Sequence, residues 1–150
     1  MKISWHHMPA RLMTGAFIVN SGMGKLRADD DTAAQMHGWA SDVYPPLRRM
    51  PPRQFIRLLG AGETTLGAAL MVPIVPSALT GAGLSAFAGG LLGLYAKTPG
   101  MRKPGSIFPT SEGIPMAKDS WLLGMGLTLT IGDLLDRQAR RGAQLRTSKK

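Results

Sequence analysis

The chain of 150 residues contains no cysteine, few aromatic residues (6%) and half as many acidic residues (9) as basic ones (18). The absence of cysteine excludes disulfides, thiolate metal sites, iron–sulfur clusters and thiol catalysis. The usual signatures of serine hydrolases, zinc proteases, dinucleotide-binding domains and phosphate-binding loops are missing as well. We therefore expect no catalytic activity from this chain on its own, and no residue is assigned a catalytic role.

The net charge of +9 first suggests nucleic-acid binding. The charges are, however, separated from the apolar residues, since Glu63 is the only charged residue between Ala61 and Tyr95. The basic residues also lack an accompanying group of aromatic side chains on which bases could stack. The charge pattern therefore predicts membrane lipids as the partner of the basic residues, and no nucleic acid.

Four segments are apolar over roughly the 20 residues that a helix needs to cross a hydrocarbon core about 30 Å thick. They comprise residues 9–26, 55–76, 77–96 and 120–136. Pro73 and Pro76 suit a tight turn between the second and third segments. The sequence predicts an all-α integral membrane four-helix bundle, a single domain over residues 1–150. A signal peptide is the less favoured interpretation of the first segment.

The connections differ in composition. Residues 27–54 contain two Pro-Pro pairs and are predicted to be partly extended, with a short helix at most. Residues 97–119 are rich in proline and glycine and are predicted to be irregular. Both lie on the same face, where they form either a lid over the bundle or plain connectors.

A basic tail over residues 137–150 is predicted to contact anionic lipid. Its cations are Arg137, Arg140, Arg141, Arg146, Lys149 and Lys150. Four spans place both termini on one side of the membrane, and lysine and arginine are divided almost evenly between the two sides. The dense tail favours cytoplasmic termini in a bacterial inner membrane.

Two stripes of small residues predict where helices approach closely. Such residues let helix backbones come together in lipid, where there is little hydrophobic gain from association. Spacing of four residues joins Gly81, Ser85, Gly89 and Gly93 in the third segment, and Ser120, Gly124, Thr128 and Gly132 in the fourth. We expect these segments to pack on each other or on a second copy of the chain.

Glu63 is the strongest candidate for a functional residue. It lies about 12 Å of helical rise into the second segment, where a carboxylate is costly unless it faces the bundle interior. Small residues around it leave room for a close neighbour. The sequence predicts an intramembrane polar site that comprises Glu63, Lys25, Asn20 and Ser21. Three roles stay open: an ion pair that fixes helix register, a proton or ligand site, and a side chain that reaches the headgroups.

The histidines lie outside the predicted spans, so we expect no haem and no metal site in the bundle. His6 and His7 are predicted to be a solvated pair at the interface beside Trp5, with adventitious metal binding as the lesser alternative. Arg11 and Lys25, at the ends of the first span, are expected to reach the headgroups.

Short motifs in the first two spans resemble the DoxX-like family of small four-span bacterial membrane proteins. In that family the first span ends near S-G-x-x-K-L, which matches Ser21 to Leu26 here. The second span carries R-L-x-G-x-x-E and a later glycine, which match Arg57 to Glu63 and Gly67. The fourth span departs from the family pattern, since Ile131 to Asp136 lacks the usual Gly-x-Gly and Ser-x-Asp.

The resemblance implies an accessory or scaffold subunit of a redox-associated or oxidative-stress-associated membrane complex. A chain in such a complex would hold a quinone or a partner enzyme, so we expect no other cofactor. A protein partner or a homo-oligomer is expected as well. The alternatives are a quinone-linked oxidoreductase subunit and a small-solute or proton pathway centred on Glu63.

Overall fold

The computed structural model describes residues 5–147, apart from the side chains of residues 143 and 145–147. Lys149 and Lys150 of the predicted basic tail lie outside this range. The elements are η1 (Trp5–His7), α1 (Met8–Leu26), α2 (Asp30–Val43), η2 (Pro45–Arg49), α3 (Pro52–Met71), α4 (Ser77–Lys97), α5 (Ile114–Ala117) and α6 (Asp119–Thr147). The described part of the chain is therefore all-α, as predicted.

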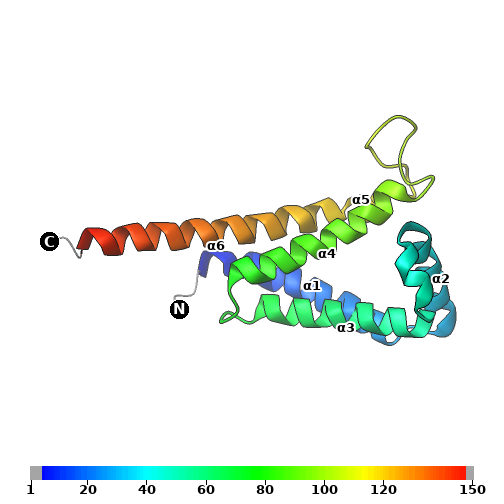
Figure 1. Ribbon diagram of the computed structural model, residues 1–150, viewed down its shortest axis with the longest axis horizontal. Helices are drawn as coiled ribbons and strands as arrows, with labels where there is room; N and C mark the ends of the chain where they lie inside the picture. The colour runs from blue at the N-terminus through cyan, green and yellow to red at the C-terminus, as the bar shows by residue number, and fades with distance from the viewer. Residues whose placement is uncertain (1–4, 148–150) are drawn as a thin grey trace.

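The long helices form two antiparallel pairs, α1 with α3 and α4 with α6 (Figure 1). The pairs meet near the turn between α3 and α4 and diverge towards the other end, where α2 lies. One fully buried side chain from each long helix forms the shared core: Ile18, Leu70, Leu84 and Leu129. The divergence beyond this layer creates the space for the cavity described below.

The predicted spans coincide with helices, except that residues 72–76 form the turn after α3. α4 is the helix among the described residues that is both long and apolar enough to cross a membrane. Its 21 residues correspond to about 31 Å of helix. A core helix of a soluble protein can pass the same test, so the helical part of the prediction is confirmed and the membrane part stays a prediction.

The first connection is more helical than predicted, because α2 spans 14 residues within it. Asp29 caps this helix: its carboxylate accepts a hydrogen bond from the backbone N–H of Thr32 at 2.8 Å. This bond lowers the pKa of Asp29 below its usual value. Asp30 and Asp31 in the first turn add favourable charge at the helix N-terminus. The helix can form because the prolines come only after its last residue, with Pro45 following Tyr44.

The predicted basic tail is a continuation of α6 as far as Thr147. Pairs four residues apart support this extension, with Arg137 Nη2 at 2.7 Å from Asp133 Oδ2 and Arg140 Nη2 at 4.0 Å from Asp136 Oδ2. Arg137, Arg140 and Arg141 are exposed. The C-terminal half of α6 projects beyond the other helices (Figure 1).

α4 and α6 do pack closely, through a different set of residues on α6. A Cβ atom added to Gly126 would lie 2.8 Å from the carbonyl oxygen of Gly81 and 2.5 Å from Ser85 Oγ. Gly89 and Gly124 have no atom within 4 Å of such a Cβ, and Thr128 is exposed. Residues at i+4 spacing advance about 40° around the helix with each step. The later members of a long i+4 stripe therefore turn away from a straight neighbouring helix.

The remaining glycines of the two predicted stripes face other elements. Gly93 on α4 lies against the Tyr44 side chain, which donates a hydrogen bond to the Gly90 carbonyl at 2.8 Å and ties the end of α2 to α4. Gly132 on α6 lies against the ring of His7. Ser120 is exposed at the start of α6.

Candidate functional site

The predicted polar site forms around an ion pair between α1 and α3. Lys25 Nζ lies 2.8 Å from Glu63 Oε2 and donates a second hydrogen bond to Ser21 Oγ at 2.8 Å. The Glu63 side chain is 2% exposed and that of Lys25 is 18% exposed. Asn20, the fourth predicted member, is exposed and does not join them. It lies one residue before Ser21, about 100° away around the helix.

Glycines explain why the two helices come close enough for this pair. A Cβ atom added to Gly22 would lie 2.7 Å from the carbonyl oxygen of Gly60, and one added to Gly15 would lie 2.7 Å from that of Gly67. Each helix therefore presents bare backbone to the other at two points seven residues apart. The small residues around Glu63 make room for α1, as the sequence predicts.

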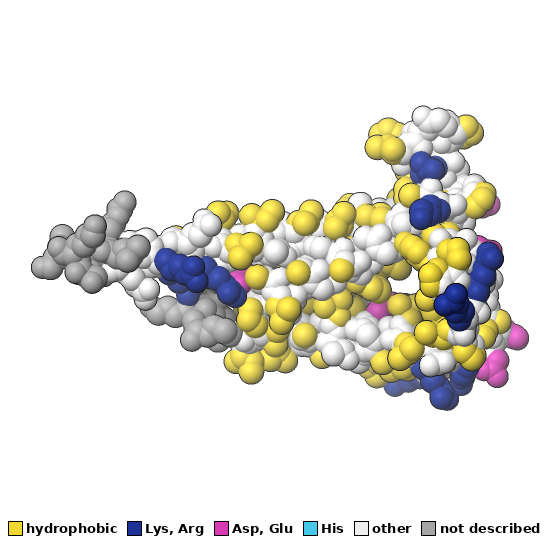
Figure 2. Space-filling view, viewed as in Figure 1, with side chains coloured by type: hydrophobic (Ala, Val, Ile, Leu, Met, Phe, Trp, Pro, Cys, Tyr) yellow, Lys and Arg dark blue, Asp and Glu magenta, His cyan; other side chains and the backbone are white. Residues whose placement is uncertain are grey.

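The ion pair borders a cavity of about 300 Å³ where the helix pairs diverge. Figure 2 shows the surface hollowed between the two pairs. The lining is largely apolar and comes from α1, α2, α3, α4, α5 and α6; its aromatic side chains are Phe17, Trp39, Phe55 and Phe87. Its charged groups are Lys25, Glu63 and Asp119. The cavity thus combines aromatic walls with charged groups of both signs.

Asp119 is a member of the site that the sequence analysis missed. Burial raises the pKa of Asp119, and the negative charge of Glu63 raises it further, while Lys25 opposes the shift. Its position contained a usable signal. In a bundle of four antiparallel spans the start of the fourth lies at the same end as the last residues of the first, and therefore near Lys25.

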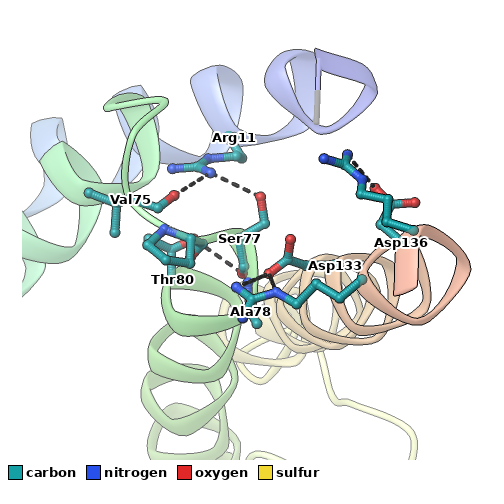
Figure 3. A network of polar contacts seen from close by, with 10 residues as sticks. Arg11, Val75, Ser77, Ala78, Thr80, Asp133 and Asp136 are labelled. Carbon is teal, nitrogen blue, oxygen red and sulfur yellow. Dashed lines mark hydrogen bonds and ion pairs between the residues drawn. The ribbon is translucent and has the colours of Figure 1, made fainter. Parts of the chain in front are cut away.

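A second polar cluster closes the opposite end of the bundle (Figure 3). The Arg11 guanidinium donates hydrogen bonds of 2.7–3.1 Å to five acceptors around the end of α3: the carbonyl oxygens of Ala69, Leu70, Val72 and Val75 and the hydroxyl oxygen of Ser77. Arg11 is 2% exposed, so it does not reach towards headgroups as predicted. It satisfies carbonyl groups that a helix end leaves without partners.

The acceptors of this cluster extend to α6. Asp133 Oδ2 accepts a hydrogen bond of 3.1 Å from the backbone N–H of Ala78, in the first turn of α4, and also pairs with Arg137. Beside it, His7 is 6% exposed, which corrects the prediction of a solvated histidine pair. Burial lowers the pKa of His7. The correction has a simple cause: Gly132 leaves room for the imidazole against α6.

No protein-family model matches the chain, and neither a curated protein nor a solved structure matches it. The DoxX-like resemblance therefore depends on the motif residues alone. Ser21, Lys25 and Glu63, which belong to those motifs, are the residues that meet at the cavity.

Proposed function

We propose that the chain is an integral membrane four-helix protein of the DoxX-like type, with residues 9–26, 55–76, 77–96 and 120–136 as spans. Figure 2 supports this proposal, since lysine and arginine gather at the two ends of the molecule and none lies across the middle of the visible face. Large apolar side chains are exposed along the long helices, among them Leu12, Leu58, Leu79, Leu127, Ile131 and Leu134. A lipid environment would cover them.

Within this protein, the cavity binds a small amphiphilic ring compound of the quinone class. The observation that carries the proposal is the Lys25–Glu63 pair at the wall of an otherwise apolar, aromatic cavity. Pockets for small molecules combine apolar walls with a few placed polar groups, and about 300 Å³ is enough for one substituted ring. An ammonium has three donors. Ser21 and Glu63 account for two among the described residues, and the third suits a quinone carbonyl.

The chain lacks cysteine and so supplies no thiol or disulfide chemistry of its own. Quinone binding therefore fits an accessory subunit of a redox-associated complex in a bacterial inner membrane. Such a subunit would hold a quinone or a partner enzyme. A protein partner or a second copy of the chain belongs to this proposal. Purification in mild detergent distinguishes quinone binding from a scaffold role. A scaffold without a ligand would co-purify with a partner protein and without quinone.

Trp39 lines the cavity, so its fluorescence reports on the ligand. We expect decylubiquinone, added to the full chain in detergent micelles, to quench tryptophan fluorescence saturably. Lys25→Met should raise the dissociation constant obtained from the quenching curve by about tenfold or more. The reason is the loss of one hydrogen bond to a charged group, which contributes about 1.5–3 kcal/mol. Lys103→Met, an exposed lysine outside the cavity, is the matched control and should bind as the wild type does.

Because Lys25→Met could also disturb folding, a second variant fills the cavity and leaves the ion pair in place. Leu59→Phe enlarges a side chain of the cavity wall without adding a fluorophore, and it should weaken saturable quenching while the melting curve stays cooperative. Equal quenching in the wild type, Lys25→Met and Leu59→Phe would refute quinone binding in this cavity.

Proton movement through the same site is a second candidate, favoured by the raised pKa of Asp119 next to Glu63. Carboxyl groups whose pKa is raised by burial and by a neighbouring like charge cluster at functional sites. Glu63→Gln would then reduce proton flux into proteoliposomes. Unchanged flux in Glu63→Gln would sink this pathway and leave quinone binding unaffected.

A further inference from the structure

His6, His7 and Asp136 come together at the end of the bundle where the chain begins. One ring nitrogen from each histidine and one carboxylate oxygen of Asp136 all lie within 4.8 Å of one another. His6 Nε2 is 3.6 Å from Asp136 Oδ2, and the two imidazole rings stand 4.2 Å apart between centroids. Residues 130 positions apart in the sequence thus place three metal-ligating groups in one small volume.

The His7 ring shows a second, independent feature of a ligand site. Its Nδ1 atom is buried and has no hydrogen-bond partner among the described residues. Buried polar atoms are usually paired, so an unpaired imidazole nitrogen calls for an explanation. Gly132 allows this arrangement, because a Cβ there would lie 2.8 Å from Nε2 of the same ring. The ring is therefore positioned by packing against α6, with one nitrogen left to find another partner.

We propose that His6, His7 and Asp136 bind a zinc ion that fastens η1 to α6. Two imidazoles and one carboxylate are a common zinc ligand set with a fourth position left for water. Magnesium and calcium prefer oxygen ligands throughout, so they fit this set poorly. The site is separate from the cavity and does not depend on the proposed quinone binding.

Only a small adjustment would complete the coordination sphere. Zinc–nitrogen and zinc–oxygen distances near 2.0–2.1 Å place tetrahedral ligand atoms about 3.4 Å apart. The His6 side chain is 64% exposed, so its ring can rotate inwards without displacing core residues. Arg140 Nη2 lies 4.0 Å from Asp136 Oδ2. Without binding the metal itself, this guanidinium would orient the carboxylate that does.

The test uses the full chain in detergent, purified on a tag without histidine and stripped with a chelator. Isothermal titration with zinc should show one ion per chain, and cobalt should produce the visible absorption bands of a tetrahedral site. His6→Gln and Asp136→Asn should each weaken zinc binding by more than about 100-fold, since even residues that only support a ligand contribute 10–100-fold. Both side chains are at least partly exposed, so both variants should fold.

His37→Gln is the matched control. His37 belongs to the same residue type, but its ring contacts the Leu47 carbonyl at 3.0 Å, far from this cluster in the fold. It should bind zinc as tightly as the wild type does. Zinc should also raise the melting temperature of the wild type and of His37→Gln, and not that of the other two variants. Binding that survives both His6→Gln and Asp136→Asn, or binding of no zinc by the wild type, would overturn the proposal.

Discussion

At the scale of single residues, Arg11 shows how much depends on the shape of one side chain. Its five hydrogen bonds use the planar fork of a guanidinium, which presents donors in several directions at once. An ammonium has one nitrogen and cannot reach all five acceptors. Arg11→Lys should therefore destabilise the protein by about 1.5–3 kcal/mol or more, the value of a single hydrogen bond to a charged group.

Thermal unfolding in detergent, followed by circular dichroism, measures this loss. Arg57→Lys is the control, since Arg57 is exposed on α3 and its replacement should leave the melting temperature nearly unchanged. Equal melting temperatures for Arg11→Lys and Arg57→Lys would show that the charge alone, and not the fork, supports the end of α3.

Asp119 predicts a pH dependence of stability. Its pKa is raised in the folded protein, so the folded state holds the proton more tightly than the unfolded state does. Stability should therefore fall as the pH rises from the unfolded pKa, near 3.8, through the higher folded pKa. Asp119→Asn removes this loss. The variant should melt at a higher temperature than the wild type at neutral pH and at the same temperature below both pKa values.

Melting curves recorded across the acid range test this expectation. Ser120→Ala, at the exposed neighbour of Asp119 on α6, serves as the control and should show the same pH dependence as the wild type. A difference between Asp119→Asn and the wild type that is constant with pH would contradict a titration of Asp119.

At the scale of helices, the glycines that touch bare backbone determine which faces meet. Gly60 lies against the carbonyl oxygen of Gly22, and a Cβ there would come within 2.8 Å of it. Gly62, two residues on, has nothing within 4 Å. Gly60→Ala should destabilise the protein by about 1–3 kcal/mol, the usual cost of overpacking. Gly62→Ala should be neutral or slightly stabilising, because alanine favours a helix over glycine.

Denaturant or thermal unfolding of the two variants side by side gives the answer. Since both changes add one methyl group to the same helix, their difference isolates the contact with α1. If Gly62→Ala were as destabilising as Gly60→Ala, the α1–α3 interface would have to lie on another face.

The helix boundaries were largely predictable and the interfaces only partly so. Apolar length and the Pro73–Pro76 turn locate α1, α3, α4 and the start of α6. The i+4 pattern correctly placed Gly81 of α4 at the interface with α6. It did not include Gly126, which is the residue of α6 that Gly81 contacts, because spacing alone does not show which residues of a straight helix face its neighbour. α2 is longer than the short helix that the sequence predicted, because the cap formed by Asp29 starts the helix well before the first Pro-Pro pair.

The same contrast applies to the candidate site. The Lys25–Glu63 pair was predictable, since a lone carboxylate in an apolar helix needs a cation nearby. The roles of Arg11 and His7 were not, because each depends on a tertiary contact, with the end of α3 and with Gly132, that no local pattern contains.

At the scale of the whole molecule, the proposed arrangement of four membrane-spanning helices makes a prediction that a soluble helical protein does not. Ala86 and Ala96 are both exposed on α4, near its middle and near its end. In a membrane, an arginine at the middle of a span costs about 2.5–3.5 kcal/mol, and at the end it reaches the interface. Ala86→Arg should sharply lower the amount of chain that resists alkaline carbonate extraction, and Ala96→Arg should not. Fractionation of cells that express each variant with a C-terminal reporter measures the fraction of the chain that resists extraction. The same reporter is expected on the cytoplasmic side of the membrane. Equal behaviour of the two variants would mean that α4 faces water.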